Sequence, residues 1–403
     1  MAPTADPVVR YLELGLALGR HVDGLVDAYY GPPDLARRAE AEPPHPPDAL
    51  AAEAARLVAD LDAGVDPDPP ADPLTPARRA WLRAQVVGLH TTAGKLSGED
   101  IGYEDEVERC YGVRPRRVPE EDLAAAHRRL DEALPGTGPL AERYIAWRES
   151  QVVPPDRLDP AIRSLAEDLR ERTDRLFGLP EGEHVEFELV TDQPWSGFNY
   201  YLGDLRSRVA INVDLPVLST SLGHLVAHEA YPGHHTEHSR KEVGLVRRRR
   251  WLEETIALVG TPSCLMAEGL ADLGLEVVVG ERPEPVVAEH LRPLGIPYDA
   301  EVVAAAAEAG DAMSGVRGNV ALLLHADGVG EEEAVSYAER WGLLPRNRAE
   351  KLVQFLTDRT WRAYMTCYVE GLPLCRRYVA GDPARFERLI TEQLTPADLQ
   401  AAA

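Results

Sequence analysis

Apolar residues recur at helical spacing along most of the chain. This period predicts helices over residues 7–30, 49–61, 76–95, 120–134, 138–149 and 159–177, and again over 216–242, 247–279, 299–326, 331–341 and 347–378. The period falls to two between His184 and Val190, and residues 208–213 are rich in β-branched side chains, so two or three short strands are expected there. The proline-rich stretches 43–47 and 67–76 predict loops, because proline cannot continue a helix.

These elements predict a mainly α fold in which a small β-sheet directly precedes a histidine-rich helix. The proline-rich loops and the helices around them suggest an N-terminal helical lobe over residues 1–150. The sheet and the histidine-rich helix then fall in a second lobe, residues 151–403, which we expect to be catalytic. A chain of 403 residues is long enough for either two lobes or one large helical domain.

The charge and cysteine content limit the partners. The formal net charge of −24 argues against nucleic acid and against an anionic membrane surface, since both require clustered Lys and Arg. The four cysteines show no C-x-x-C spacing, the N-terminus has no signal-peptide pattern, and no apolar run approaches a bilayer-spanning length. We therefore expect a cytoplasmic protein without a disulfide framework; the oligomeric state is left open.

Five of the twelve histidines fall within fifteen residues, at positions 224, 228, 234, 235 and 238. Zinc binds imidazole nitrogen and carboxylate oxygen, and a hydrolytic zinc site keeps one position open for water. Glu229 directly follows His228, where a carboxylate could take a proton from that water. The cluster therefore predicts a zinc-dependent hydrolase with Glu229 as general base.

The spacing departs from H-E-x-x-H, because Pro232 occupies the position four residues after His228. On a regular helix His234 would lie about 240° around the axis from His228, so the helix must bulge or break near Pro232. A break would let His234, our first choice, or His235, our second, return to His228. The pair of His224 and His228 could bind a metal without any break, but would leave the Pro-Gly-His-His unexplained.

A third ligand is expected from the helical segment Leu265–Asp272. Glu268 stands there among apolar or small neighbours, and a metal would relieve the cost of burying its carboxylate. Gly269 and Ala271 would let this helix approach the histidine helix closely. Asp272, one turn after Glu268, could hydrogen bond to a ligand histidine.

The segment His228-Glu-Ala-Tyr-Pro-Gly-His-His235, followed by Glu268-Gly-Leu-Ala271, resembles the HEAxPGHH and EGxA signatures of the bacterial domain of unknown function 885 family. That family is similar to zincin metallopeptidases of the glutamate-ligand type. The resemblance extends to Asp27–Pro32, to the stretch from Arg317 to His325 and to residues 363–371. Leu270 departs from the tryptophan usual in EGWA.

The resemblance implies a zincin-like helical metallopeptidase whose metal ligands are His228, His234 and Glu268, with Glu229 as general base. It also implies that Tyr368 lies near the reacting carbonyl, where its phenol could stabilise the oxyanion. Taken by itself, Tyr368 could instead be a core or packing residue.

Two further residues lie on the predicted helix 299–326. His325 could contact the substrate or the oxyanion, or it could be a core histidine. Arg317 could bind a substrate carboxylate through two parallel hydrogen bonds, or it could pair with an internal acid.

The sequence therefore predicts a zinc metallohydrolase, by first choice a peptidase, acting on a peptide or small amide. Two alternatives use the same residues: a metal-dependent enzyme acting on a small non-peptide metabolite, and a non-catalytic metal-binding scaffold. The substrate, endo- or exo-cleavage, and zinc against another divalent metal are left open.

Overall fold

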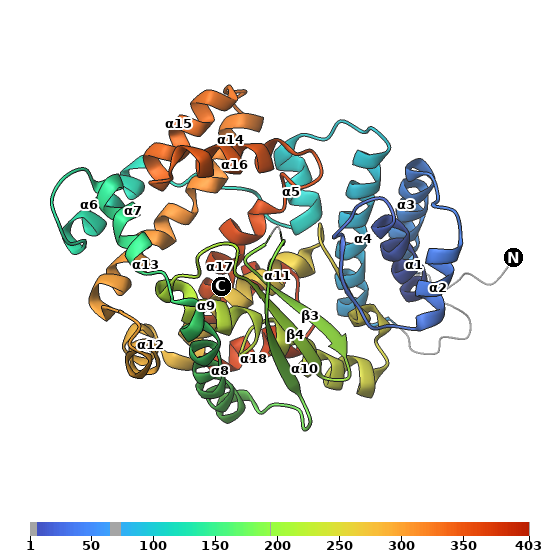
Figure 1. The fold of residues 1–403 in the computed structure, drawn as a ribbon. Helices are drawn as coiled ribbons and strands as arrows, with labels where there is room; N and C mark the ends of the chain where they lie inside the picture. The colour runs from blue at the N-terminus through green and yellow to red at the C-terminus, as the bar shows by residue number, and fades with distance from the viewer. Residues whose placement is uncertain (1–5, 65–73, 194, 403) are drawn as a thin grey trace, which may run out of the picture.

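A computed structural model describes residues 6–64, 74–193 and 195–402 of the chain, so most of the proline-rich stretch 67–76 lies outside the described residues. The fold is mainly α, as predicted (Figure 1). The α-helices are α1 Pro7–Gly19, α2 Pro33–Ala41, α3 Pro47–Ala63, α4 Pro76–Leu96, α5 Tyr103–Tyr111, α6 Glu120–Ala133, α7 Leu140–Ser150, α8 Pro155–Phe177, α9 Ser219–Glu229, α10 His234–Lys241, α11 Pro262–Val279, α12 Glu284–Leu291, α13 Ala300–Ser314, α14 Val316–His325, α15 Glu331–Gly342, α16 Arg346–Thr357, α17 Met365–Val379, α18 Pro383–Thr391 and α19 Pro396–Ala402. Three short helices of other types are the π-helix Glu242–Arg247 and the 3₁₀ turns Leu252–Thr255 and Arg292–Leu294.

The strands form two small sheets. The three-stranded sheet has the order β2-β4-β3, with bounds β2 His184–Val190, β3 Gly197–Gly203 and β4 Arg206–Asn212. Strand β2 runs parallel to β4, and β3 runs antiparallel to it. The chain then enters α9, so the prediction of a small sheet directly before the histidine-rich helix is confirmed. Strands β1 Val26–Tyr29 and β5 Ile256–Leu258 form a separate antiparallel pair.

The predicted helices 7–30 and 247–279 are wrong in part, and for one shared reason. Helix α1 ends at Gly19, and the residues that follow turn through Gly24 at φ +79° into β1. Residues 256–258 form β5 instead of helix, and α11 starts only at Pro262. The two strands pair with each other across more than half of the chain, and helical periodicity carries no information on such a distant partner.

The buried apolar side chains of the described residues form two large cores and a small third cluster, which lies mainly on α6 and α13. The smaller core joins α1, α3 and α4 to two residues of β5, Ile256 and Leu258. The larger core holds buried residues of α5, α8, α9, α11, α14 and α17, together with β4. In Figure 1 the helices α1–α4, coloured blue, lie to one side of the molecule, and the rest of the chain surrounds α11. The cores thus divide near residue 100, whereas the lobe boundary expected at residue 150 stays a prediction.

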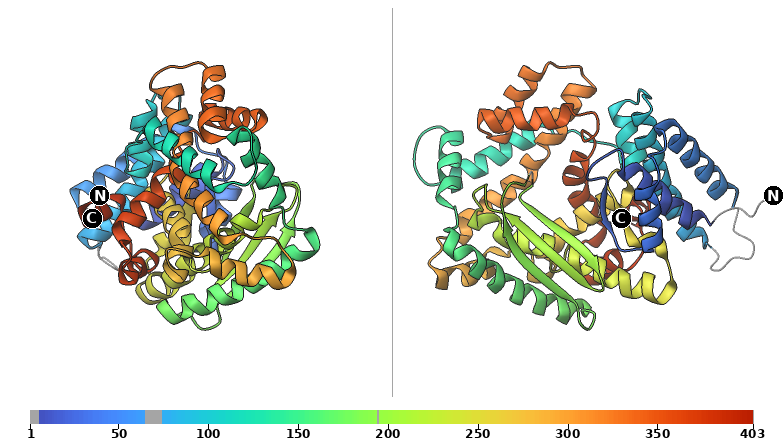
Figure 2. Two further views of the ribbon diagram at one scale, coloured as in Figure 1. Left: turned by 90° about the vertical axis from the view of Figure 1, so that its left-hand side faces the viewer. Right: turned by 45° about the vertical axis from the view of Figure 1, so that its right-hand side comes forward.

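The sheet β2-β4-β3 lies on the outside of the larger body, beside α8 and α10 (Figure 2). Its inner residues Val209 and Ile211 are fully buried and belong to the same core as Leu222 and Val226 of α9. The sheet and α11 therefore hold α9 from two directions, which fixes the position of the histidines at its end.

All four cysteines are free thiols. Among the described residues, no helix is both long enough and apolar enough to cross a membrane.

Candidate metal centre

The helix is interrupted between α9, which ends at Glu229, and α10, which begins at His234, as the position of Pro232 predicts. The peptide bond before Pro232 is cis, and the N–H of Gly233 donates to the carbonyl of Ala227 over 2.9 Å. A Cβ atom on Gly233 would lie 1.9 Å from the carbonyl oxygen of His228, so only glycine fits this turn. The break returns α10 to the end of α9 and places His234 beside His228.

Three side chains converge at this break. His234 Nε2 lies 3.1 Å from His228 Nε2, which lies 3.4 Å from Glu268 Oε2 of α11. In a tetrahedral zinc site with bonds of about 2.0–2.1 Å, neighbouring ligand atoms lie about 3.3–3.4 Å apart. The three atoms already hold positions close to this separation, and all lie within 4.8 Å of one another.

The carboxylate of Glu268 supports a cation at this point. The residue is only 8% exposed, and its Oε2 atom is buried without a hydrogen-bond partner among the described residues. Its other oxygen, Oε1, accepts a hydrogen bond from the Tyr364 hydroxyl at 3.1 Å. A buried carboxylate oxygen aimed at two imidazole nitrogens costs free energy unless a positive charge lies between them. The donor set of two nitrogens and one oxygen therefore fits a divalent metal such as zinc.

Asp272 orients His228 from behind. Its Oδ1 lies 2.8 Å from His228 Nδ1, so the Nε2 atom of the ring is left to face His234 and Glu268. Burial acts to raise the pKa of Asp272, but hydrogen bonds from His224 and His228 hold that pKa well below its usual range. A carboxylate behind a ligand histidine sets its tautomer and ring orientation. The structure thus has the hydrogen bond that the sequence suggested for Asp272.

The alternative pair of His224 and His228 also finds a carboxylate. These two residues and Asp272 form a second group that could hold a metal ion. His224 is about half exposed, however, and it lies 3.3 Å from the same Asp272 oxygen that His228 contacts. This group engages His228 through Nδ1 and leaves the buried Glu268 oxygen without a partner, so the first group accounts for more of the structure.

His235 points away from the break. It is fully buried, its Nδ1 lies 2.8 Å from Ser207 Oγ of β4, and its Nε2 lies 2.8 Å from Glu183 Oε2. Glu183 is also bound by the hydroxyl of Tyr231 and by Arg170. His235 therefore ties α10 to the sheet, and of the two adjacent histidines it is His234 that faces the other candidate ligands.

Glu229 sits next to the cluster at the end of α9. The residue is 6% exposed, and Gly197 of β3 lies against its carboxyl group, because a Cβ on Gly197 would be 3.1 Å from Glu229 Oε1. Burial raises the pKa of Glu229 to about 7; the charge of His228 opposes this shift and that of Glu268 adds to it. A carboxyl group with a pKa near neutrality can both accept and return a proton, as general base catalysis requires.

Two tyrosines of the C-terminal part face the cluster. The hydroxyls of Tyr364 and Tyr368 lie 2.8 Å apart, and Tyr364 donates to Glu268. Burial and the Glu268 carboxylate raise the pKa of both phenols, so both remain protonated donors. The structure therefore brings Tyr368 to the site, as the resemblance implied.

Arg317 also belongs to this region. The next residue, Gly318, packs against Val369, which follows Tyr368 in the sequence. A Cβ atom added to Gly318 would lie 3.1 Å from the side chain of Val369. The side chain of Arg317 is exposed, yet surrounding protein lowers its pKa, while Tyr368 and Asp272 act in the opposite direction. Among the described residues it has no hydrogen bond and no ion pair with an acid. The internal-acid alternative for Arg317 thus finds no support, and its guanidinium remains available for a ligand.

His325 is not brought to the cluster. Its Nε2 lies 2.7 Å from the carbonyl oxygen of Leu356, and its ring stacks on Tyr103 at 5.1 Å between ring centres. The charges that act on its pKa are those of Arg362 and Glu106, and none belongs to the cluster. These contacts favour a structural role for His325 as a core histidine over a contact with the substrate or the oxyanion.

The glycines of α11 serve a different contact from the one expected. Gly269 lies against α17, where an added Cβ would be 2.4 Å from the carbonyl oxygen of Gly371. The close approach to the histidine segment occurs at Gly274 instead, where an added Cβ would be 2.9 Å from Pro232. The expectation for Gly269 was therefore wrong, because helical spacing shows which residues share a face but not which neighbour that face meets.

Sequence reasoning missed two side chains of this region. Tyr364 precedes Tyr368 by four residues, and this spacing on a helix could have indicated a pair on one face. Asp27 was given no role, although the resemblance extends to Asp27–Pro32, because the periodicity assigned this segment to a helix far from the histidines in the sequence. The charge of Asp27 raises the pKa of Glu229, and the charge of Glu268 raises the pKa of Asp27.

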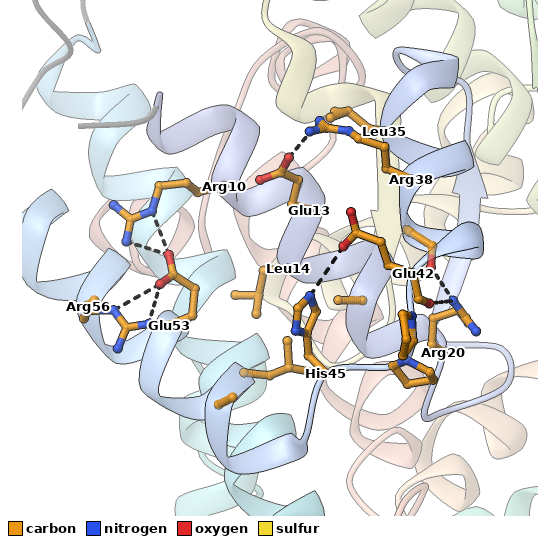
Figure 3. Close-up of a pocket in the computed structure, with 16 residues that line it drawn as sticks. Arg10, Glu13, Leu14, Arg20, Leu35, Arg38, Glu42, His45, Glu53 and Arg56 are labelled. Atoms are coloured by element: carbon orange, nitrogen blue, oxygen red, sulfur yellow. Dashed lines mark hydrogen bonds and ion pairs between the residues drawn. The ribbon is translucent and has the colours of Figure 1, made fainter. Parts of the chain in front are cut away.

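A separate pocket of about 390 Å³ lies among α1, α2 and α3 (Figure 3). Five of its seven Arg and Glu side chains pair with one another: Glu53 binds Arg10 and Arg56, and Glu13 binds Arg38. It contains none of the candidate site residues, so it is distinct from the metal centre.

Comparisons with known proteins support the fold alone. No family model and no curated protein matches the chain. Among solved structures, the chain is similar to a "putative lipoprotein" from Colwellia psychrerythraea, with a TM-score of 0.55 and 16% identity over 88% of this chain. It is also similar to a "putative lipoprotein of unknown function" from Shewanella oneidensis, with a TM-score of 0.51 and 14% identity over 88% of this chain. The chain spans 65% of the length of the first protein and 72% of the second.

Proposed function

We propose that this chain is a zinc-dependent hydrolase with a zincin-like catalytic lobe, and that it cleaves amide bonds of peptides. The observation that carries the proposal is the convergence of His228, His234 and the unpartnered Glu268 oxygen at tetrahedral spacing, with the buried Glu229 next to them. A metal-binding scaffold would have no need of a proton-accepting carboxylate at that position. The metal ligands alone would be compatible with many small-molecule substrates. The presence of Arg317 favours a substrate that carries a carboxylate, as a peptide does.

The residues divide the chemistry among them. A zinc ion bound by His228, His234 and Glu268 would lower the pKa of a water molecule and polarise the scissile carbonyl. Glu229 takes a proton from the attacking water and passes it to the leaving amine. The water oxygen forms a new bond to the carbonyl carbon, the C–N bond breaks, and the products are a carboxylate and an amine. The hydroxyl of Tyr368 donates a hydrogen bond to the oxygen that gains negative charge. Asp272 keeps His228 in the tautomer that this arrangement needs.

Arg317 would recognise a carboxylate of the substrate. Its guanidinium lies near Tyr368 and Asp272, and a second arginine, Arg148 of α7, lies close enough to lower its pKa. Arg148 stacks on Tyr144 and has no acidic partner among the described residues. Two arginines without acids attract an anion, and a carboxylate matches the fork of a guanidinium.

Elemental analysis with activity measurements tests the proposal. Wild-type protein should hold about one zinc per chain, and His228→Ala, His234→Ala and Glu268→Ala should each lose it. His224→Ala, on the exposed face one turn earlier, is the matched control and should keep the metal. Glu229→Gln should also keep the metal but lose at least about 100-fold in hydrolysis of a peptide mixture. Metal loss in His224→Ala with retention in Glu268→Ala would replace the proposed site by the second group.

The peptide screen decides between the proposed substrates. Bound zinc with no hydrolysis of any peptide would refute the peptidase assignment and leave the metabolite alternative. A wild-type protein without metal, even after reconstitution with zinc, would refute the hydrolase itself.

The cytoplasmic location is likewise a proposal, and it rests on the four free thiols. The two similar structures carry lipoprotein names, which point to the cell envelope instead. Cell fractionation followed by detection of the chain decides this question, since recovery in the membrane fraction contradicts the cytoplasmic location.

A further inference from the structure

Two cysteines meet between α11 and α17, beside the candidate metal centre. The Sγ atoms of Cys264 in α11 and Cys367 in α17 lie 3.9 Å apart. Cys367 is fully buried, whereas Cys264 is partly exposed. Neither thiol belongs to a group of described residues that could hold a metal ion. The pair is therefore a cluster of nucleophilic side chains that the proposed hydrolysis does not use.

The two helices lie close enough for a covalent link between these side chains. A Cβ atom added to Gly371 of α17 would lie 2.9 Å from the carbonyl oxygen of Leu265 in α11, so the backbones nearly touch about one turn after each cysteine. A disulfide bond joins sulfur atoms about 2.05 Å apart, so the two Sγ atoms must approach by about 1.9 Å. Rotation about the two Cα–Cβ bonds, with a small shift of either helix, can supply this approach.

The same two segments share the hydrogen bond that supports the candidate ligand Glu268. Glu268 follows Cys264 by one helical turn, and Tyr364, which donates to Glu268, precedes Cys367 by three residues. The thiol contact and the hydrogen bond from Tyr364 to Glu268 are thus neighbouring contacts between the same parts of the chain. Shortening the thiol contact by about 1.9 Å must therefore alter the geometry of the hydrogen bond beside it.

We propose that Cys264 and Cys367 form a site of reversible oxidation, at which hydrogen peroxide creates a disulfide that links α11 to α17 and slows hydrolysis. The disulfide is independent of the proposed function, whereas its effect on hydrolysis rests on that function. A bond between the two helices would displace Tyr364 and Tyr368 relative to Glu268, because both tyrosines lie within three residues of Cys367.

The reaction takes place in two steps. Cys264 reacts first, because it is the thiol of the pair that solvent reaches. Its sulfur takes one oxygen atom from peroxide and becomes a sulfenic acid, and the other oxygen leaves as water. The sulfur of Cys367 then attacks the sulfenic sulfur, the S–O bond breaks, and a second water leaves as the disulfide forms. Peroxide is reduced to water, and both sulfur atoms are oxidised.

The pair stays reduced until an oxidant is present. The hydrogen bond with Cys367 and burial raise the pKa of the Cys264 thiol, and burial raises the pKa of Cys367. Because the thiolate is the reacting form, oxidation should be slower than that of a thiol with a lowered pKa. A reducing cytoplasm would keep both thiols free in the same way. The disulfide is therefore expected only after exposure to peroxide.

Counting thiols on the full chain tests the modification site. Wild-type protein is treated with hydrogen peroxide, denatured and alkylated with iodoacetamide, and its peptides are then identified by mass spectrometry. We expect two of the four thiols to be lost, with Cys264 and Cys367 in one linked peptide that dithiothreitol separates. Cys264→Ala and Cys367→Ala should not form this link. Cys110→Ala and Cys375→Ala, which remove the other two thiols, are the matched controls and should form it as wild type does.

Peptide hydrolysis tests the effect on the site. Oxidation of wild type should lower the rate by about tenfold or more, since a displacement of about 1 Å can cost a factor of 100, and dithiothreitol should restore it. Cys264→Ala should keep its own untreated rate after the same exposure to peroxide. Zinc content and circular dichroism of each protein before treatment establish that the variants retain metal and fold.

A link between other cysteines, oxidation of one sulfur without a link, or four free thiols after treatment would overturn the site. The expected disulfide with an unchanged rate of hydrolysis would overturn its effect on the enzyme. If reduced, zinc-loaded wild type cleaves no peptide, the proposed function fails together with the effect on hydrolysis, and the thiol count still decides the site.

Discussion

The two adjacent histidines of the motif should respond in opposite ways to substitution. His234→Ala removes a ring that contacts the candidate metal ligands, whereas His235→Ala removes a ring that connects α10 to β4 and Glu183. We therefore expect His234→Ala to abolish zinc binding with little effect on the stability of the metal-free protein. We expect His235→Ala to keep zinc binding but to destabilise the fold.

The magnitude for His235→Ala follows from its two buried hydrogen bonds. The bond to the Glu183 carboxylate involves a charged group and contributes about 1.5–3 kcal/mol, and the bond to the Ser207 hydroxyl contributes about 0.5–1.5 kcal/mol. The change should therefore lower the free energy of unfolding by about 2–4.5 kcal/mol. His234 is partly exposed, and its one hydrogen-bond contact within the described part of the chain is to His228, so His234→Ala should change the stability of the metal-free protein by less than about 1 kcal/mol.

Urea denaturation of chelator-treated protein, followed by circular dichroism, measures the free energy of unfolding of the metal-free form. Elemental analysis after reconstitution measures the zinc content of the same two variants. Each variant serves as the control for the other. The reasoning is refuted if His235→Ala loses zinc while its metal-free form unfolds with the wild-type free energy. Glu183→Gln gives an independent check, because its effect should be largely lost in the His235→Ala background if the two side chains act as a pair.

Three further predictions concern the surroundings of the site. Gly269→Ala should destabilise the protein by about 1–3 kcal/mol, since the added methyl group meets the backbone of Gly371 2.4 Å away; an unchanged thermal midpoint would contradict this packing. Tyr368→Phe should lower kcat by about 100-fold with zinc content unchanged, because one donor to the developing oxyanion is lost, and a change confined to KM would argue for a binding role instead. Removal of zinc with a chelator should lower the free energy of unfolding by about 2.7 kcal/mol relative to protein at a free zinc concentration 100 times the dissociation constant, and a midpoint independent of zinc would show that the folded state has no specific site.

Local sequence was sufficient for the parts of the site that depend on neighbours along the chain. The adjacency of His228 and Glu229, and the helix break at Pro232, follow from covalent order and from the missing N–H of proline. The small sheet before the histidine helix was also predictable, because a change from helical to two-residue periodicity is a local property. Glu268 could be chosen as a candidate ligand because a lone acid among apolar residues on a helix needs a partner, whatever that partner is.

Tertiary structure decided everything that depends on which surfaces meet. His234 and His235 differ by one position, and only the packing of α10 on the sheet turns one ring to Glu183 and the other to His228. The β1–β5 pair joins residues more than two hundred positions apart, so no periodicity could show that Val26–Tyr29 lies beside the strand that precedes α11. Gly269 and Gly274 lie on one helix, yet α17 and the Pro232 turn approach it from different sides. The sequence by itself determined the types of side chain available to the candidate site; long-range packing determined which of them meet there, because contacts between distant segments leave no local pattern.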